Sequence, residues 1–158
     1  MDGDVVSVER VIPAGPAGIF AVIADASRHP DIDGSGTVRR VKTGAPRMLG
    51  PGSTFGMSMQ KGIRYSTVST VIEFEPNRRI AWQTRPDGFL GGFLGRFLAG
   101  RIWRYELEPT EGGTLVRESW DISQDHQRAL LRLGGLPDKT AADMARTLEC
   151  IEGIVTAT

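Results

Sequence analysis

Cysteine and histidine are scarce in this sequence. Cys150 is the one cysteine among 158 residues, so no disulfide can form within the chain and a reducing compartment is expected. The two histidines, His29 and His126, lie far apart in the chain, and neither stands beside a second ligand type at metal-binding spacing. We therefore expect no metal site and no cofactor, and no catalytic triad is visible.

An excess of positive charge and a long apolar run are also lacking. Lys+Arg number 19 and Asp+Glu also number 19, whereas binding to nucleic acid requires a cationic surplus on at least one face. No stretch reaches the roughly 18 apolar residues of a membrane span, and the N-terminal MDGDVVSVER does not have the basic start of a leader peptide. The sequence thus predicts a cytoplasmic protein that does not bind nucleic acid.

The chain contains enough apolar residues for one packed core. It is 40% apolar and 24% charged, fractions typical of a globular protein, and its length favours a single domain over residues 1–158. Residues 4–12 are rich in β-branched side chains and predict a strand, which ends at Pro13. A short helix follows, with Ile19, Phe20 and Ile23 on one face, and Pro30 limits any further helix to a turn. Residues 36–43 predict a short second strand.

From residue 53 onwards the hydrophobic period is two, which predicts antiparallel strands joined by tight turns. The first strands place Phe55, Met57 and Met59 on one face, and then Val68, Thr70, Ile72 and Phe74. After RIAWQT at 79–84, the later faces are Trp103, Tyr105 and Leu107, then Val116, Glu118, Trp120 and Ile122. A turn at 111–113 joins these last two strands.

The C-terminal segment instead has the period of a helix. Residues 138–155 place five apolar side chains on one stripe, namely Ala141, Met144, Leu148, Ile151 and Val155. Asp138 is the expected N-cap of this helix. Because only one face is apolar, we expect the helix to lie against the sheet.

Three stretches carry a resemblance to a known family: SRHPDIDGSG at 27–36, VIEFEPNRRIAW at 71–82 and WRYELEPTEGGTLVRESWDI at 103–122. They are similar to stretches of START-like, or SRPBCC, proteins of the polyketide cyclase/dehydrase type. The resemblance implies an α+β helix-grip fold, in which a curved antiparallel sheet of six to seven strands wraps around a long C-terminal helix. Two short helices would follow the first strand, and a mostly apolar cavity would lie between sheet and helix.

HPDIDG, residues 29–34, partly matches a calcium-binding loop. The match fails because His29 takes the first ligand position and Arg40 takes the position that requires a bidentate glutamate. A turn in which Asp31 and Asp33 bond to the local backbone, with Gly34 at positive φ, explains the same residues.

Glu118 is the most informative candidate for a site residue. If the alternation holds, its carboxyl group points to an apolar interior, where it must pair, stay protonated or meet water. Its expected partners are Arg101 and Arg64, and Tyr105 and Glu118 are the candidate catalytic residues. The predicted ligand-binding lining is Phe55, Met57, Met59, Val68, Trp82, Phe93, Phe97, Trp103, Tyr105, Glu118, Trp120, Met144 and Leu148.

Three functions are compatible with these residues. The favoured one is binding of a small hydrophobic or aromatic molecule, lipid-like or polyketide-like, in the cavity. The alternatives are an aromatase/cyclase-type enzyme, in which Glu118, Tyr105 and an arginine provide acid, base or oxyanion contacts, and a regulator that binds a protein partner. Whether the chain is an enzyme stays open at this point.

FLGGFLGRFLAG, residues 89–100, repeats Phe-Leu at intervals of four residues. A helical conformation would align Phe93 and Phe97 in one apolar face, but the glycines make such a helix marginal. The segment is interpreted as a mobile lid over the cavity or as a fixed plug of the core. A third interpretation is an apolar patch through which residues 89–98 contact a membrane surface or form a homodimer.

Overall fold

The computed structural model describes residues 1–87 and 100–157 of the chain. Seven antiparallel strands form one sheet in the order β1-β7-β6-β5-β4-β3-β2. The strands are β1 Val5–Ile12, β2 Val38–Val41, β3 Thr54–Lys61, β4 Ile63–Glu75, β5 Arg79–Pro86, β6 Arg101–Thr110 and β7 Gly113–Asp121. The helices are α1 Pro16–Ala24, the 3-10 turn η1 Ala26–Arg28, α2 His29–Ile32, α4 Arg128–Leu131 and α5 Leu136–Thr156.

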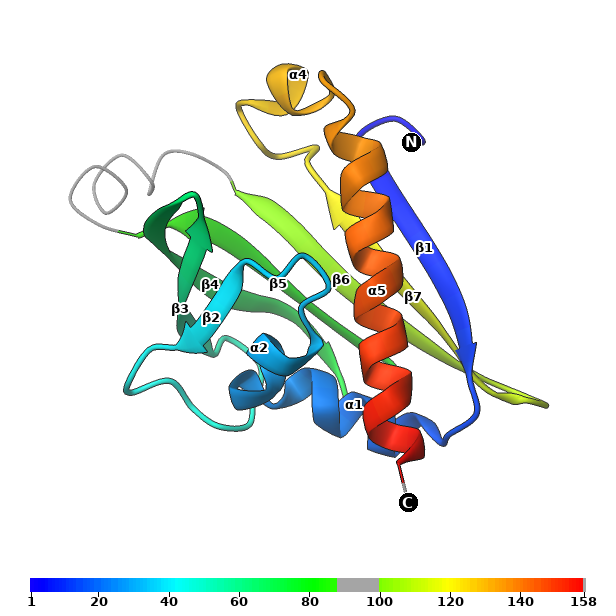
Figure 1. The fold of residues 1–158 in the computed structure, drawn as a ribbon. Coiled ribbons are helices and arrows are strands. Elements are labelled where there is room, and N and C mark those ends of the chain that lie inside the picture. Colours follow the sequence, from blue (N-terminus) through cyan, green and yellow to red (C-terminus); the bar gives the residue numbers. More distant parts are fainter. Residues whose placement is uncertain (88–99, 158) are drawn as a thin grey trace.

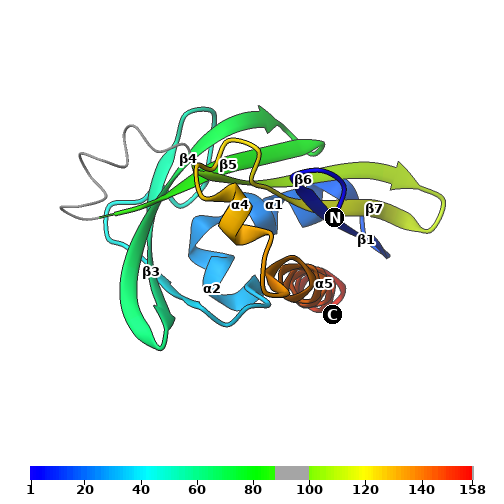
Figure 2. The same cartoon turned by 90° about the horizontal axis from the view of Figure 1, so that it is seen from above.

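The sheet curves around the long helix α5, which confirms the expected helix-grip fold. Figure 1 shows α5 crossing one face of the sheet, with α1 and α2 on the same side. Seen from above, the strands run from β1 round to β3 and enclose these helices (Figure 2). The apolar stripe of α5 faces inward, with Met144, Leu148 and Ile151 almost fully buried. The helix thus closes the concave side of the sheet.

The start of α5 differs from the sequence prediction, whereas α2 is the short turn that the sequence predicts. Helix α5 begins at Leu136 with Gly135 as its N-cap, so Asp138, the predicted cap, lies in the first turn. Pro137 fits this earlier start because proline is favoured in the first helical turn. Helix α2 is a single turn that includes His29 in helical geometry, although Pro30 follows it.

The predicted inward face of the β4 segment is wrong. Ser69 and Val71 are buried, whereas Thr70 is exposed and Ile72 keeps 47% of its surface accessible. The register with β5 shifts between Val71 and Glu73, a β-bulge that inserts one extra residue. Since side chains alternate faces along a strand, the bulge returns Phe74 to the core while placing Val68 on the outer side.

The loop after α2 forms the predicted turn through Asp33, whereas Asp31 lies within α2 and forms an ion pair with Arg28 instead. The glycines of the loop also have other roles than expected. The Asp33 carboxylate accepts hydrogen bonds from the backbone N–H groups of Ser35 and Val38 at 3.1 and 2.8 Å. Gly36, rather than Gly34, has positive φ. A Cβ atom on Gly34 would collide with the backbone of α5, where the Gly34 N–H donates to Thr147 Oγ1 at 2.9 Å. This close approach fixes the α2–β2 loop to the helix.

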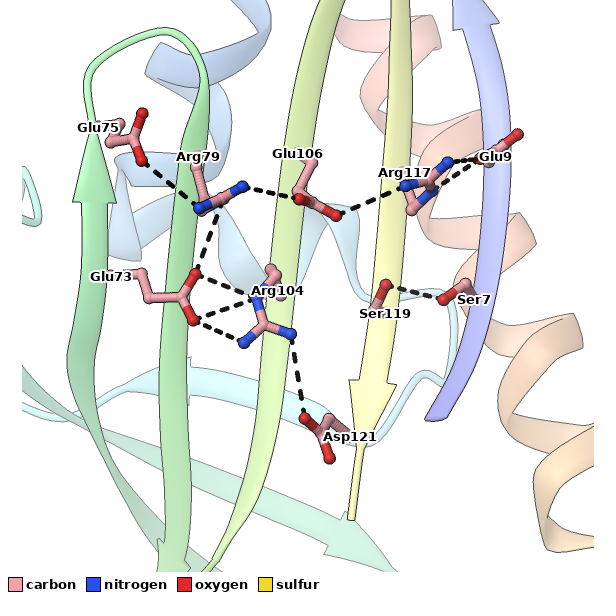
Figure 3. Close-up of polar contacts among 10 residues, drawn as sticks. All are labelled: Ser7, Glu9, Glu73, Glu75, Arg79, Arg104, Glu106, Arg117, Ser119 and Asp121. Carbon is pink, nitrogen blue, oxygen red and sulfur yellow. Dashed lines mark hydrogen bonds and ion pairs between the residues drawn. The ribbon is translucent and has the colours of Figure 1, made fainter. Parts of the chain in front are cut away.

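Charged residues cover the outer face of the sheet, where they alternate with the inward residues of the same strands. Figure 3 shows their network, which crosses β4, β5, β6, β7 and β1. Arg104 donates to both carboxylate oxygens of Glu73, and Arg79 bridges Glu73 and Glu106. Each carboxylate of this network therefore has an arginine partner.

Two sequence predictions remain: the role of residues 89–100 and the absence of a membrane span. The lid, plug, membrane-contact and dimer interpretations fall almost wholly on residues 88–99, outside the described part of the chain. Among residues 1–87 and 100–157, none of the helices combines the length and apolar character that crossing a bilayer requires.

Candidate ligand cavity

A cavity of about 270 Å³ lies between the concave face of the sheet and α5. Its walls come from β2 to β7, from α2 and the loop after it, and from residues 136–147 of α5. Nine of the predicted site residues line it: Phe55, Met57, Met59, Trp82, Trp103, Tyr105, Glu118, Trp120 and Met144. The alternation of β3, β6 and β7 thus places their inward side chains in one hollow.

Four predicted residues are not among these. Val68 does not line the cavity, because the face of β4 that points inward is that of Tyr65, Thr67 and Ser69. Leu148 is buried in the hydrophobic core on α5, away from the cavity wall. Phe93 and Phe97 lie outside the described residues.

Tyr105 and Glu118 form the polar centre of the cavity. The register of β6 and β7 pairs the two residues directly, and the Tyr105 hydroxyl donates to Glu118 Oε1 at 2.8 Å. Tyr105 is 4% exposed and Glu118 is 2% exposed. The other carboxyl oxygen, Oε2, is buried without a hydrogen-bond partner among residues 1–87 and 100–157. Glu118 therefore faces inward, as the alternation predicts.

Burial governs the protonation of this pair. It raises the pKa of Glu118 to about 8, against the opposing hydrogen bond from Tyr105, and the negative charge of Asp33 adds to the rise. Burial and the neighbouring Glu118 also raise the pKa of Tyr105 well above its usual value. At neutral pH the predominant state is therefore a neutral carboxyl group beside a neutral phenol.

The predicted arginine partners of Glu118 are wrong. Arg101 does line the cavity, but its Nε lies 3.3 Å from Asp125 Oδ2, with which it forms an ion pair. Arg64 is exposed near the β3–β4 turn, opposite Gln60. Alternation identifies the face of a strand, whereas the pairing register decides which residues are neighbours, and here it selects Tyr105.

An aromatic cluster forms the wall beside Tyr105. The Trp82 ring stacks on His29 with centroids 5.0 Å apart and lies 5.6 Å from the Tyr105 ring. Phe55 packs edge-on against both His29 and Trp82. Such contacts between rings stabilise a wall of rigid side chains, which is suited to hold a flat apolar molecule.

His29 was not predicted as part of the site. Its Nε2 lies 2.9 Å from the Ile23 carbonyl oxygen, which can only accept, so Nε2 carries the proton. Burial lowers the pKa of His29, which keeps the imidazole neutral at neutral pH. Its place beside Trp82 depends on tertiary packing of α2, for which a single sequence carries no signal.

Other polar residues of the cavity lining were also missed. They share a hydroxyl, carboxylate or amine group and come from several elements: Asp33, Ser35, Thr37, Lys61, Tyr65, Thr67, Ser69, Thr84, Lys139, Thr140, Asp143 and Thr147. Thr140 and Thr147 alternate with the apolar stripe of α5, so a helical wheel that included threonines would have found them. The lining of the cavity thus combines aromatic and apolar side chains with polar ones.

A second hollow, of about 370 Å³, lies on the outer face near the β4–β5 turn. Arg79, Glu106 and Arg117 in its lining are already engaged in the ion pairs of Figure 3. No group of three or more acidic, histidine or cysteine side chains that could hold a metal ion is found in the described part of the chain. The inner cavity is therefore the stronger candidate site.

The fold and the cavity together define a helix-grip protein with an internal cavity between the sheet and α5. The family model "Polyketide cyclase / dehydrase and lipid transport" matches residues 4–151, and the chain belongs to this family. The match covers every strand of the sheet and most of α5.

Its relatives include an uncharacterised Mycobacterium tuberculosis protein, Rv0088, which is 38% identical over 120 residues. That alignment covers 73% of this chain but 45% of Rv0088, so the chain spans about half the length of its relative. A further uncharacterised M. tuberculosis protein, MT0096, matches at 37% identity over the same length.

Similar folds occur in solved structures at low sequence identity. The chain matches protein CV1439 of Chromobacterium violaceum with a TM-score of 0.69 and 15% identity, covering 98% and 99% of the two chains. Ara h 8.0201 matches with a TM-score of 0.70 and 15% identity over 98% of each chain. The di-domain ARO/CYC StfQ of the steffimycin biosynthetic pathway matches with a TM-score of 0.68 and 16% identity, over 96% of this chain and 50% of StfQ. These likenesses establish the fold.

Proposed function

We propose that this protein binds a small hydrophobic, aromatic or lipid-like molecule in the cavity between the sheet and α5. The observation that carries the proposal is the composition of the wall, in which three tryptophans, three residues of Phe or Met on β3, and a single buried carboxyl group face one hollow. Ligand sites are commonly apolar hollows with a few well-placed polar groups. The family description, which includes lipid transport, supports the same proposal.

The size of the cavity limits the ligand. About 270 Å³ is near the lower end of the roughly 300 to 1,000 Å³ of small-molecule pockets. The methionines Met57, Met59 and Met144 allow some adjustment, because their unbranched side chains repack around different shapes. A molecule of two to four fused rings or a short acyl chain is the ligand that we expect.

The direct test is native mass spectrometry of the protein purified from its own host, in which we expect a co-purifying small molecule. The matched variants are Thr67→Trp, which fills the cavity from β4, and Thr70→Trp, which adds the same side chain on the exposed face of that strand. Thr67→Trp should lose the molecule while Thr70→Trp retains it. Retention by both variants would contradict a ligand in this cavity.

A second function, catalysis of a cyclase or aromatase type, is favoured by one observation. A carboxyl group whose pKa is about 8 lies 2.8 Å from a phenol hydroxyl inside the cavity, and such a group can transfer protons near neutral pH. StfQ, which shares the fold, is an ARO/CYC protein. Turnover of a linear poly-β-ketone thioester into a ring product, lost in Glu118→Gln, would establish this function. Stoichiometric binding without turnover would leave the carrier function.

A further inference from the structure

The unpaired oxygen of Glu118 indicates which polar group a ligand would carry. Glu118 Oε1 accepts from the Tyr105 hydroxyl, whereas Oε2 is buried in the cavity wall with no partner in the part of the chain that the structure describes. A buried polar atom without a hydrogen bond costs about 1 to 3 kcal/mol. A ligand that bonds to Oε2 would remove this cost.

Whether Oε2 accepts or donates depends on the charges that face it. From the side of α2, His29 is neutral and Asp33 is negative, so neither stabilises a carboxylate. From β3 and β4, Lys61 is exposed and Tyr65 is 41% exposed, so both reach solvent at the cavity edge. These two sides therefore supply no buried cation.

The remaining two sides hold cations that already have anionic partners. Arg101 on β6 pairs with Asp125, and Lys139 on α5 pairs with Asp143. An ionised carboxylate without a cation in an apolar interior is strongly disfavoured, so the group stays protonated. Because Oε1 receives the Tyr105 hydrogen bond, the acid proton is on Oε2, the oxygen without a partner in the described residues, where it is free to act as a donor.

We propose that the cavity selects a ligand carbonyl oxygen, which accepts a hydrogen bond from the protonated Glu118 Oε2, so that the bound molecule is a small, flat, uncharged ketone or quinone. This inference rests on the proposed function, since it assigns the chemistry of a ligand in the same cavity. A hydrocarbon of the same shape would leave the donor unpaired, and an anionic carboxylate would find no available buried cation among the residues described.

Three probes of one tricyclic shape test the proposal: 9-fluorenone, 9-fluorenol and fluorene. All three tryptophans line the cavity, so their fluorescence reports binding. At about pH 6.5 we expect fluorenone to bind about fivefold to tenfold more tightly than fluorene, the effect of one added hydrogen bond. At about pH 9.5, where Glu118 is ionised, fluorenone should lose this advantage, whereas fluorenol, which can also donate, should retain its affinity.

Two substitutions at Glu118 isolate the role of the acid proton. Glu118→Gln keeps a donor at this position and should retain the preference for fluorenone at both pH values. Glu118→Leu removes the donor and should bind fluorenone and fluorene equally at both pH values. Equal thermal melting of the Gln variant and the wild type at about pH 6.5 would show that the fold is intact.

The outcomes separate this proposal from the proposed function. Binding of all three probes with equal affinity to the wild type would overturn the carbonyl preference and leave a general apolar site. A preference for fluorenone that persists in Glu118→Leu would assign the recognition to another group and would also overturn the proposal. Failure of every probe to bind would contradict the proposed function itself.

Discussion

The two faces of the sheet hold carboxyl groups in opposite states. On the outer face, Glu73 accepts hydrogen bonds from Arg104, which with the neighbouring positive charges lowers the pKa of Glu73. On the inner face, Glu118 has one phenol as its partner, and burial raises its pKa to about 8. The same residue type in one sheet is thus an ionised structural group on one side and a neutral polar group on the other.

The two carboxyl groups differ in ionisation because they differ in exposure to solvent and in the cations beside them. The Glu73 side chain is 30% exposed and lies within a network of arginines, so its charge is screened by water and balanced by cations. Glu118 is 2% exposed, and the cations around the cavity are paired with aspartates or reach solvent. An inner face with neutral polar groups accommodates an uncharged ligand at the smallest cost of desolvation.

The largest expected effect is on the pH dependence of folding. The pKa of Glu118 is about 8 in the folded state and 4.5, the ordinary value, in the unfolded state. The contribution of this group to the free energy of unfolding is therefore complete below about pH 4.5 and is lost as pH rises to about 8. His29, whose pKa is lowered, has the opposite effect, but only below about pH 6.5. Between about pH 6.5 and 8 we therefore expect the free energy of unfolding to fall by about 2 kcal/mol.

Urea denaturation at several pH values measures this fall. Glu118→Gln cannot ionise and should show an almost flat profile over the same range. An identical fall in wild type and variant would show that another group is responsible.

Tyr105→Phe should have the next largest effect. Removal of the hydroxyl leaves both carboxyl oxygens of Glu118 without a partner, which should lower the free energy of unfolding by about 1 to 3 kcal/mol. The same change at Tyr65, which lines the cavity edge and is 41% exposed, should cost less than about 0.5 kcal/mol. Equal effects at the two positions would mean that the Tyr105–Glu118 hydrogen bond contributes little.

The smallest effect is expected on the outer face. Glu73→Gln removes the ion pair with Arg104, and because the pair is partly exposed the cost should be at most about 1 kcal/mol and should shrink in high salt. Glu111→Gln, in the exposed β6–β7 turn, is the control and should be neutral. A cost at Glu73 that does not depend on salt would indicate that the network is shielded from solvent, as the inner face is.

Much of the fold and part of the site could be predicted from the sequence. Whether alternation succeeded depended on how each strand pairs with its neighbours. Alternation correctly placed Trp103, Tyr105, Glu118 and Trp120 inward, because β6 and β7 pair without a bulge. It failed in β4, where the bulge at Ile72 exchanges the two faces. A bulge depends on the neighbouring strand, so the hydrophobic period of one segment does not reveal it.

The partner of Glu118 could have been found from the turn. Thr110 pairs with Gly113, so a two-residue loop joins β6 and β7, and counting back from it places Tyr105 opposite Glu118. His29 had no comparable signal, because its contact with Trp82 joins α2 to a distant strand.

Carbon-13 NMR titration of the glutamate carboxyl groups tests most directly whether the two faces hold their carboxyl groups in opposite states. The signal assigned to Glu118 by its absence in Glu118→Gln should titrate near pH 8, whereas Glu73 should titrate below its ordinary pKa of 4.5. Titration of Glu118 near 4.5 would show an ionised group in the cavity at neutral pH. That result would contradict the neutral inner face and, with it, the carbonyl-binding donor.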